Sequence, residues 1–209
     1  MNENYIITST SSKSDDNEIS ATKIFLFDKG NKLVKYIKNS NQNTIFLLLP
    51  WYNKQNDKYY ILQFAYKKIT INNLLEEELY AEFINEPENN HLSGFIYQKN
   101  NCDYLCSSSY NGHINIWDLY HKKIVKIFKI EGCKLIHIIE WNKKFIITAD
   151  YNNRLIKIID IENEYSITTN INSGHNKNLL SIKKINHPIY GESLLSVAED
   201  MIIKLWTIE

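Results

Sequence analysis

Three cysteines and two of the six histidines lie close enough in the sequence to suggest a metal site: Cys102, Cys106, His113, Cys133 and His137. A short Cys-Cys pair followed by a histidine has the look of a ligand set. The spacing as a whole, however, matches none of the usual zinc patterns, and three cysteines cannot all pair in disulfides. We therefore expect these side chains to pack as core residues and predict no metal site.

The serine run Ser107 to Ser109 is the second group that could do chemistry. A nucleophilic serine of the hydrolase type lies in a Gly-x-Ser-x-Gly turn, and phosphate-binding loops are rich in glycine. The chain has neither motif and no paired-carboxylate constellation. The acidic run Glu76 to Glu78 is typical of a solvent-exposed turn. We expect no catalytic residue, no cofactor and no small-molecule substrate.

Charge and hydropathy indicate which classes of partner the protein binds and in which cellular compartment it lies. The 24 basic and 24 acidic side chains cancel, which argues against binding to nucleic acid or to an anionic membrane. The longest apolar run, residues 44 to 51, is far shorter than the roughly 18 residues of a membrane span. The N-terminus lacks a basic start and an apolar signal core. These features predict a soluble intracellular protein, placed in the cytoplasm.

The elements that position these residues are predicted to be strands. Short runs rich in Ile, Tyr, Phe and Thr, such as "YIITST", "YYILQF" and "FIITAD", alternate with polar clusters every 8 to 12 residues or so. An all-β protein follows. One segment, "NLLEEELYAEF" at 73 to 83, also fits a helix.

Strands of one shape recur along the chain. They end at Phe27, Asn72, Trp117, Ile159 and Trp206, with spacings of 45, 45, 42 and 47 residues. A period of 40 to 45 residues is the length of a four-stranded propeller blade. In this register the ambiguous segment supplies an outer strand, which favours strand over helix there.

The sequence "LCSSSYNGHINIWDL" at 105 to 119 and the "SGH" at 173 to 175 resemble the repeats of the WD40 (G-beta-like) β-propeller family. The resemblance implies blade-like units at about 1–42, 43–88, 89–131, 132–174 and 175–209, forming a single propeller region over 1–209. About 18 strands, or four and a half blades, would be present. Because the first unit begins at a second strand, we expect a divergent and partial or open propeller.

In that family a His, a Ser or Thr, an Asp and a Trp form a hydrogen-bonded chain within each blade. The resemblance places His91, Ser109, Asn111 and Trp117 in this chain in the third unit, where the Asp is replaced by Asn. In the fifth unit it places His175, Asp200 and Trp206, with Ala198 in place of the hydroxyl. The family role of these residues is structural, since each buried polar group needs a partner.

The resemblance implies a non-catalytic scaffold that binds other proteins, whose identity the sequence does not give. The family's contact face would carry Ser11 to Glu18, Tyr110 with Asn111, Asn152 to Arg154, Gly174 to Lys177, and Glu199 with Asp200. Among these, Tyr110 and Arg154 are the predicted partner contacts, because Tyr and Arg are enriched at hot spots. Two alternatives stay open. One is a truncated propeller fragment, without independent function or completed by another chain; the other is an RNA-binding propeller, suggested by aromatic residues near lysines.

Overall fold

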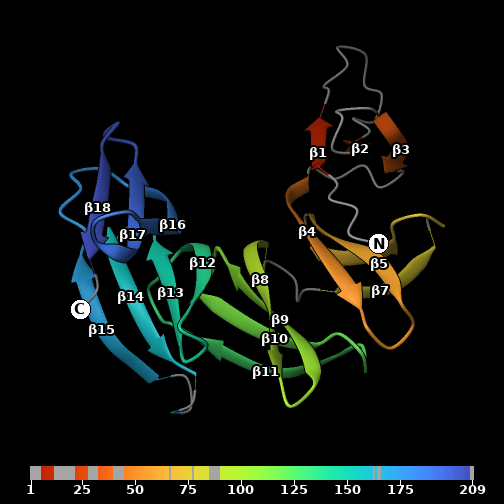
Figure 1. The fold of residues 1–209 in the computed structure, drawn as a ribbon. Helices are drawn as coiled ribbons and strands as arrows, with labels where there is room; N and C mark the ends of the chain where they lie inside the picture. Colours follow the sequence, from red (N-terminus) through yellow and green to blue (C-terminus); the bar gives the residue numbers. More distant parts are fainter. Residues whose placement is uncertain are drawn as a thin grey trace. The chain divides into compact units, whose positions relative to one another are not determined.

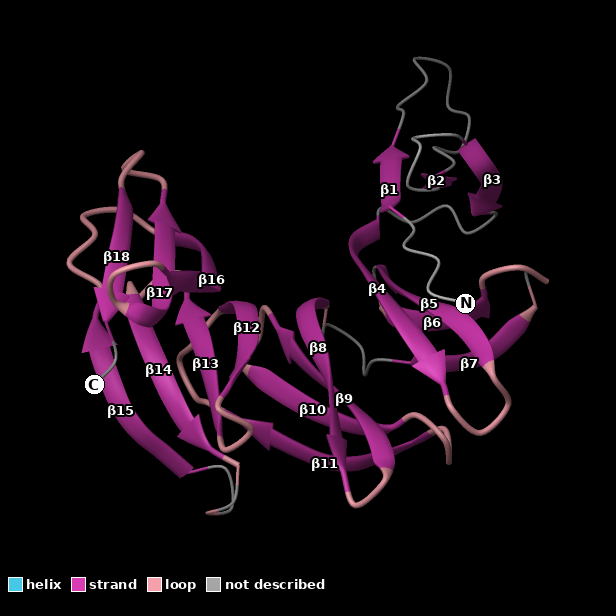
Figure 2. Cartoon of the chain, in the orientation of Figure 1, coloured by secondary structure: helices cyan, strands magenta, loops and turns pink. Residues whose placement is uncertain are grey.

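The structure is a computed structural model of the 209-residue chain. It describes residues 6–11, 22–27, 33–39, 45–65, 67–76, 78–84, 90–161, 163 and 166–207. Within these ranges every regular element is a β-strand, which confirms the all-β prediction (Figure 2). In the same ranges no helix has the length and apolar character needed to cross a membrane.

The described strands form five antiparallel sheets, each made of strands consecutive in the chain. The first sheet contains β1 (Ile6–Ser11), β2 (Thr22–Phe27) and β3 (Leu33–Asn39); the second contains β4 (Ile45–Asn53), β5 (Lys58–Ala65), β6 (Lys68–Asn73) and β7 (Leu79–Ile84). The third contains β8 (His91–Lys99), β9 (Cys102–Ser109), β10 (His113–Asp118) and β11 (Lys123–Lys129); the fourth contains β12 (Leu135–Trp141), β13 (Phe145–Asp150), β14 (Leu155–Asp160) and β15 (Ser166–Asn172). The fifth contains β16 (Leu179–His187), β17 (Gly191–Ala198) and β18 (Ile203–Thr207). Each sheet falls inside one of the five expected units, and these 18 described strands match the expected number of strands.

The chain divides into two compact units, Met1–Asn85 and Glu86–Glu209. In the second unit the three sheets pack face to face, because β12 contacts β8 and β9 on one side and β16 on the other (Figure 1). One apolar core, including Cys106, Ile116 and Ile146, fills the first of these two interfaces. A second core, including Trp141 and Leu194, fills the other. In the first unit, β1 contacts β4.

The ambiguous segment at 73 to 83 contains a turn followed by a strand. Residues 74–76 form the turn, and β7 pairs with β6. Ala81 and Phe83 are buried while Glu82 and Ile84 are exposed, a two-residue period that only a strand produces. The preference for a strand here is confirmed, and its cause is pairing with β6 rather than local propensity.

The outer strands β3, β7, β11 and β15 share one irregularity. In each of them a register shift inserts one extra residue in the outer strand, and these extra residues are Val34, Tyr80, Val125 and Thr168. The shift lies opposite the end of the third strand of the sheet in all four cases. A β-bulge at one fixed place shows that the sheets are copies of one structural unit.

Gly112 illustrates how tightly the turn between β9 and β10 is built. Its φ is +82°, and a Cβ there would lie 2.4 Å from the carbonyl oxygen of Ile130. Gly191 also has a positive φ, +69°, but a Cβ there would meet no atom within 4 Å. Gly112→Ala should therefore lower the free energy of unfolding by about 2 kcal/mol or more, and the control Gly191→Ala by about 1 kcal/mol. Urea melts of both variants measure this, and equal losses would contradict the close approach.

Candidate interaction face

In the third, fourth and fifth sheets, the same backbone hydrogen bond holds the turn that follows the second strand. The backbone N–H groups of Tyr110, Tyr151 and Glu199 donate to the carbonyl oxygens of residues in the loop that enters the first strand of the same sheet. The acceptors are Asn90 (3.2 Å), Lys134 (2.9 Å) and Asn178 (3.0 Å). Because the bond repeats, these three side chains stand at equivalent positions in neighbouring sheets.

The side chains at these positions form a continuous row of contacts. The Tyr110 and Tyr151 rings lie 6.4 Å apart between centroids, inclined by 49°. The Tyr151 hydroxyl donates to a Glu199 carboxylate oxygen at 2.6 Å, and Asn178 Nδ2 donates to the other oxygen at 3.0 Å. At the other end, Lys134 Nζ donates to the Tyr110 hydroxyl at 2.9 Å and lies 4.5 Å from the ring centroid. The row therefore spans three blades and ends on opposite charges.

The hydrogen bond to Glu199 holds the pKa of Tyr151 above its ordinary value, because the carboxylate accepts a hydrogen bond that only the protonated phenol can donate. Asn178 acts in the opposite direction. At neutral pH the Tyr151 hydroxyl is therefore a fixed donor to Glu199. This fixes the direction of the Tyr151 side chain relative to the next blade.

Arg154 lies in the same turn as Tyr151, directly before β14. Its φ is 57°, and its N–H donates to the carbonyl of Asp150 at 3.1 Å. Its guanidinium Nη1 donates to the carbonyl of Asn176, in the loop before β16, at 3.2 Å. The exposed Arg154 side chain thus joins two loops of this face. We call Tyr110, Lys134, Tyr151, Arg154 and Glu199 the loop face.

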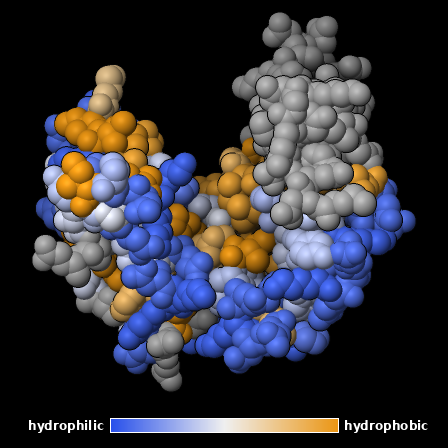
Figure 3. All heavy atoms as spheres, viewed as in Figure 1, coloured by the Kyte–Doolittle hydropathy of each residue, from blue (hydrophilic) through white to orange (hydrophobic). Residues whose placement is uncertain are grey.

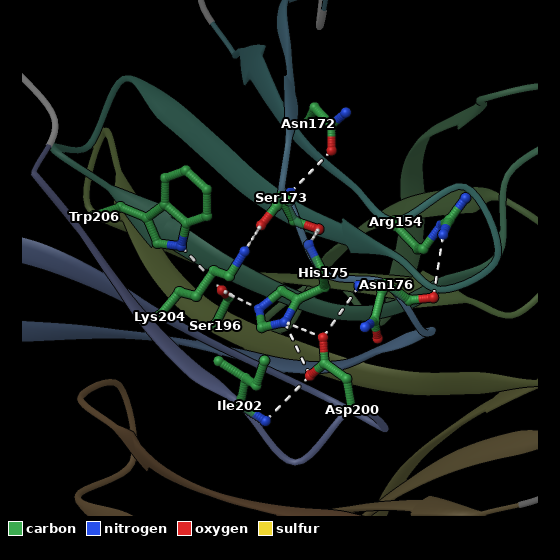
Figure 4. A network of polar contacts seen from close by, with 11 residues as sticks. Arg154, Asn172, Ser173, His175, Asn176, Ser196, Asp200, Ile202, Lys204 and Trp206 are labelled. Atoms are coloured by element: carbon green, nitrogen blue, oxygen red, sulfur yellow. Dashed lines mark hydrogen bonds and ion pairs between the residues drawn. The ribbon is translucent and has the colours of Figure 1, made fainter.

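A polar network in the fifth sheet holds the loop before β16, which receives the hydrogen bond from Arg154 (Figure 4). The buried His175 ring contacts the Asp200 carboxylate through Nδ1 at 3.0 and 3.1 Å, and the Ser196 hydroxyl through Nε2 at 2.9 Å. Trp206 Nε1 donates to the same hydroxyl at 2.9 Å. The network ties the loop before β16 to the β17–β18 turn.

The carboxylate of Asp200 also caps its surroundings. It accepts the backbone N–H groups of Asn176 and Ile202, both at 3.1 Å. Burial by itself raises the pKa of Asp200, but the hydrogen bonds from His175, Ile202 and Asn176 outweigh it, so the pKa lies below the ordinary value. Asp200 is therefore ionised under all ordinary conditions.

The hydroxyl in this network corrects the residue alignment. Sequence comparison assigned Ala198 to its position and inferred that the hydroxyl was lost, whereas Ser196 supplies it. Residues 196 and 198 lie two positions apart on one strand and face the same side of the sheet. A repeat pattern alone therefore does not tell which of the two lies beside Trp206. Ser196 is opposite Lys204, and Trp206 reaches it on the diagonal.

The third sheet repeats only part of this network. Trp117 Nε1 donates to the Ser107 hydroxyl at 2.9 Å, the same diagonal contact as in the fifth sheet. Ser109, expected in that role, accepts the backbone N–H of His113 at 3.0 Å instead. The displacement is again two residues along the strand.

His91 does not take the place of His175. It is the first residue of β8 and lies opposite Ser109, the position that Leu179 holds in the fifth sheet. Its Nε2 lies 3.0 Å from Asn115 Nδ2, and its buried Nδ1 has no hydrogen-bond partner. Asn111 therefore does not replace Asp200 at that nitrogen. Burial, with a smaller contribution from His113, lowers the pKa of His91 to about 3, so the ring is neutral.

Two of the cysteines considered as metal ligands, Cys106 and Cys133, are buried. Burial raises the pKa of Cys133 to about 11 and that of Cys106 well above its ordinary value. Both thiols belong to the apolar core between the third and fourth sheets. The described part of the chain contains no cluster of three or more potential metal ligands.

Sequence reasoning missed several residues of this face. It placed Tyr110, Arg154 and Glu199 on this face, but not Tyr151, Lys134 or the neighbouring Asn178. A signal for Tyr151 existed, because a tyrosine follows the second strand in both "CSSSYNG" and "TADYNN". Lys134 and Asn178 carry no such signal, since they enter through loop geometry. The stretch after Ser11, expected on the same face, lies outside the described residues.

Comparison with known proteins gives one relative by sequence and many by structure. No protein-family model matches the chain. Human Protein NEDD1 is 29% identical over 110 residues, which is 50% of this chain and 16% of that protein. The chain thus spans about one sixth of the length of this relative.

The solved structures of similar fold cover more of this chain than the sequence relative does. A chain of the Chaetomium thermophilum Polycomb Repressive Complex 2 bound to GSK126 has a TM-score of 0.69 at 15% identity, covering 83% of this chain and 41% of that one. The WD40 β-propeller domain of Doa1 has a TM-score of 0.68 at 14% identity, covering 95% of this chain and 63% of that one. These likenesses concern the fold, and they agree with the five consecutive antiparallel sheets and their shared bulge.

Proposed function

We propose that this chain, a WD40-repeat β-propeller, is a non-catalytic scaffold that binds another protein through its loop face. One solved structure of similar fold is a chain of the Polycomb Repressive Complex 2, whose name states that it is an assembly, and this likeness supports a role in a protein assembly. The neutral formal charge argues against nucleic acid as the partner.

The observation that carries the proposal is the row from Lys134 through Tyr110 and Tyr151 to Glu199. Tyrosine offers a large, rigid contact area with a polar tip, and it is enriched at binding hot spots. Here two tyrosines are fixed by their neighbours before any partner arrives, so little side-chain entropy is lost on binding. Arg154 adds a planar donor held in place by a backbone carbonyl.

The test compares two surfaces that lie at opposite ends of the strands. The double variant Tyr110→Ala/Arg154→Ala removes two exposed side chains of the loop face. The matched control, Tyr190→Ala, removes an exposed tyrosine from the β16–β17 turn. Partners are recovered by affinity purification with mass spectrometry, and affinity for a recovered partner is then measured with purified proteins. We expect about tenfold weaker binding for the double variant and no change for the control.

Two results would contradict the proposal. Unchanged affinity of the double variant would show that the partner binds elsewhere. Equal weakening by the Tyr190 control would show that the effect is not specific to the loop face. Circular dichroism of each variant checks that the strands are retained.

A further inference from the structure

The outer strand β11 has an unusual combination of exposed apolar and basic side chains. Ile124, Val125 and Ile127 are exposed, with 38%, 53% and 49% of their surface accessible. Lys123 and Lys129 are exposed and Lys126 is half-buried. The sequence around it, 121 to 134, contains five lysines and one glutamate in a chain whose formal charge is zero.

β11 is also the last strand in its sheet, whose order is β11-β10-β9-β8. An outermost strand has backbone N–H and C=O groups that point away from its neighbour and can pair with another strand. The regular part of this edge begins after the bulge at Val125 and runs to Lys129. It therefore offers a short ladder of hydrogen bonds together with apolar and basic side chains.

The sister strand β15 shows that the outer position does not require this composition. β15 has the same length, the same place in its sheet and the same bulge, yet its sequence, SITTNIN, carries no charge. Lysines on an edge commonly protect it from aggregation. Protection alone does not explain why three apolar residues are exposed beside them, since β15 exposes one large apolar side chain, Ile167, among Ser, Thr and Asn.

The lysines of β11 decide which charge can pair with this edge. Lys123 lies before the bulge at Val125, while Lys126 and Lys129 lie in the regular part, where Lys129 contacts Glu131 at 3.0 Å. Two β11 edges side by side would place lysines near lysines, and like charges opposite each other are destabilising. A strand with acidic residues would instead place opposite charges beside Lys126 and Lys129. The charge pattern thus disfavours a second copy and favours an acidic partner.

The fifth sheet also has an exposed edge strand, β18, but this strand supports no proposal about a partner. β18 has exposed Ile203 and Leu205, and apolar residues gather over this sheet in Figure 3. No charge pattern there selects one occupant. β11 is different because its lysines specify the chemistry of what binds.

We propose that β11 is a docking edge for an extended, acidic segment of another protein, which adds a fifth strand to the third sheet. Its backbone pairs with the edge, its acidic side chains lie opposite the lysines, and its apolar side chains cover Ile124 and Ile127. This surface is additional to the loop face and does not depend on the function proposed for it.

The probe is a fluorescein-labelled peptide, Glu-Ile-Val-Glu-Ile-Phe-Glu, which is the β11 sequence with glutamate for each lysine. Fluorescence anisotropy measures its affinity for the full 209-residue chain at low salt. Lys123→Glu/Lys126→Glu should weaken binding by about tenfold or more. Ser166→Glu/Thr169→Glu, at the matching positions of β15, should leave it within about twofold. The same peptide with N-methyl groups on alternate residues should not bind, because it keeps its charge but cannot pair.

Several outcomes would overturn the proposal. Undiminished binding of the N-methylated peptide, or equal effects of the two double variants, would reduce the contact to unspecific charge attraction. Sedimentation showing a dimer that Ile127→Glu abolishes would assign the edge to a second copy. Binding of phosphatidylserine vesicles or of oligouridylate through Lys123 and Lys126, without binding of the peptide, would assign it to a polymer or surface of phosphates.

Discussion

Trp117→Ala is expected to lower the free energy of unfolding by about 3–5 kcal/mol, because it empties a large aromatic site in the third sheet. Trp117 is 5% exposed, and its Nε1 donates to the buried Ser107 hydroxyl. The measurement is a urea melt beside the parent chain, with the slope checked for a change in cooperativity.

Trp206 is the matched control for this prediction. It makes the same hydrogen bond to Ser196 at the same length, but its side chain is only half-buried. Trp206→Ala should therefore cost less, about 1–3 kcal/mol, since less apolar surface is lost. If Trp117→Ala melts like the parent chain, Trp117 is not packed in a blade and the description of the third sheet is wrong.

The second large effect is expected at His175. His175→Ala should cost about 2–4 kcal/mol, because it leaves a cavity and removes the partner of Asp200 and one partner of Ser196. The loop before β16 should loosen with it. Hydrogen exchange of the Asn176 amide, which donates to Asp200, reports that loosening directly.

The same network predicts a dependence of stability on pH. The pKa of Asp200 is lowered in the folded chain, so its contribution is fully present above the unfolded value of about 4. It is lost as the pH falls through the folded pKa. Asp200→Asn should therefore flatten the loss of stability below about pH 4, measured by urea melts between pH 2.5 and 7. A pH dependence identical to that of the parent chain would contradict the lowered pKa.

The sequence determined the all-β class and the arrangement of the strands in consecutive sheets. Period-two runs at regular intervals predict strands, and the 42-to-47-residue spacing assigns each strand its place in a unit. Even the ambiguous segment was predicted correctly, because the repeat register, unlike local propensity, includes pairing with β6. The assignment of Tyr110 and Arg154 as partner contacts stays a prediction.

The tertiary structure decided which residues meet. Strand periodicity gives the face of a side chain but not its position along the strand. The hydroxyl was therefore assigned to residues 109 and 198, each two residues beyond Ser107 and Ser196, which accept the tryptophan N–H. His91 was aligned with His175 by type, yet it lies on β8 itself while His175 lies in a loop. The row from Lys134 to Glu199 joins three blades through loops, and no local pattern in the chain specifies contacts between repeats. Distances across blades depend on how the sheets pack, which the apolar cores set and a linear sequence does not display.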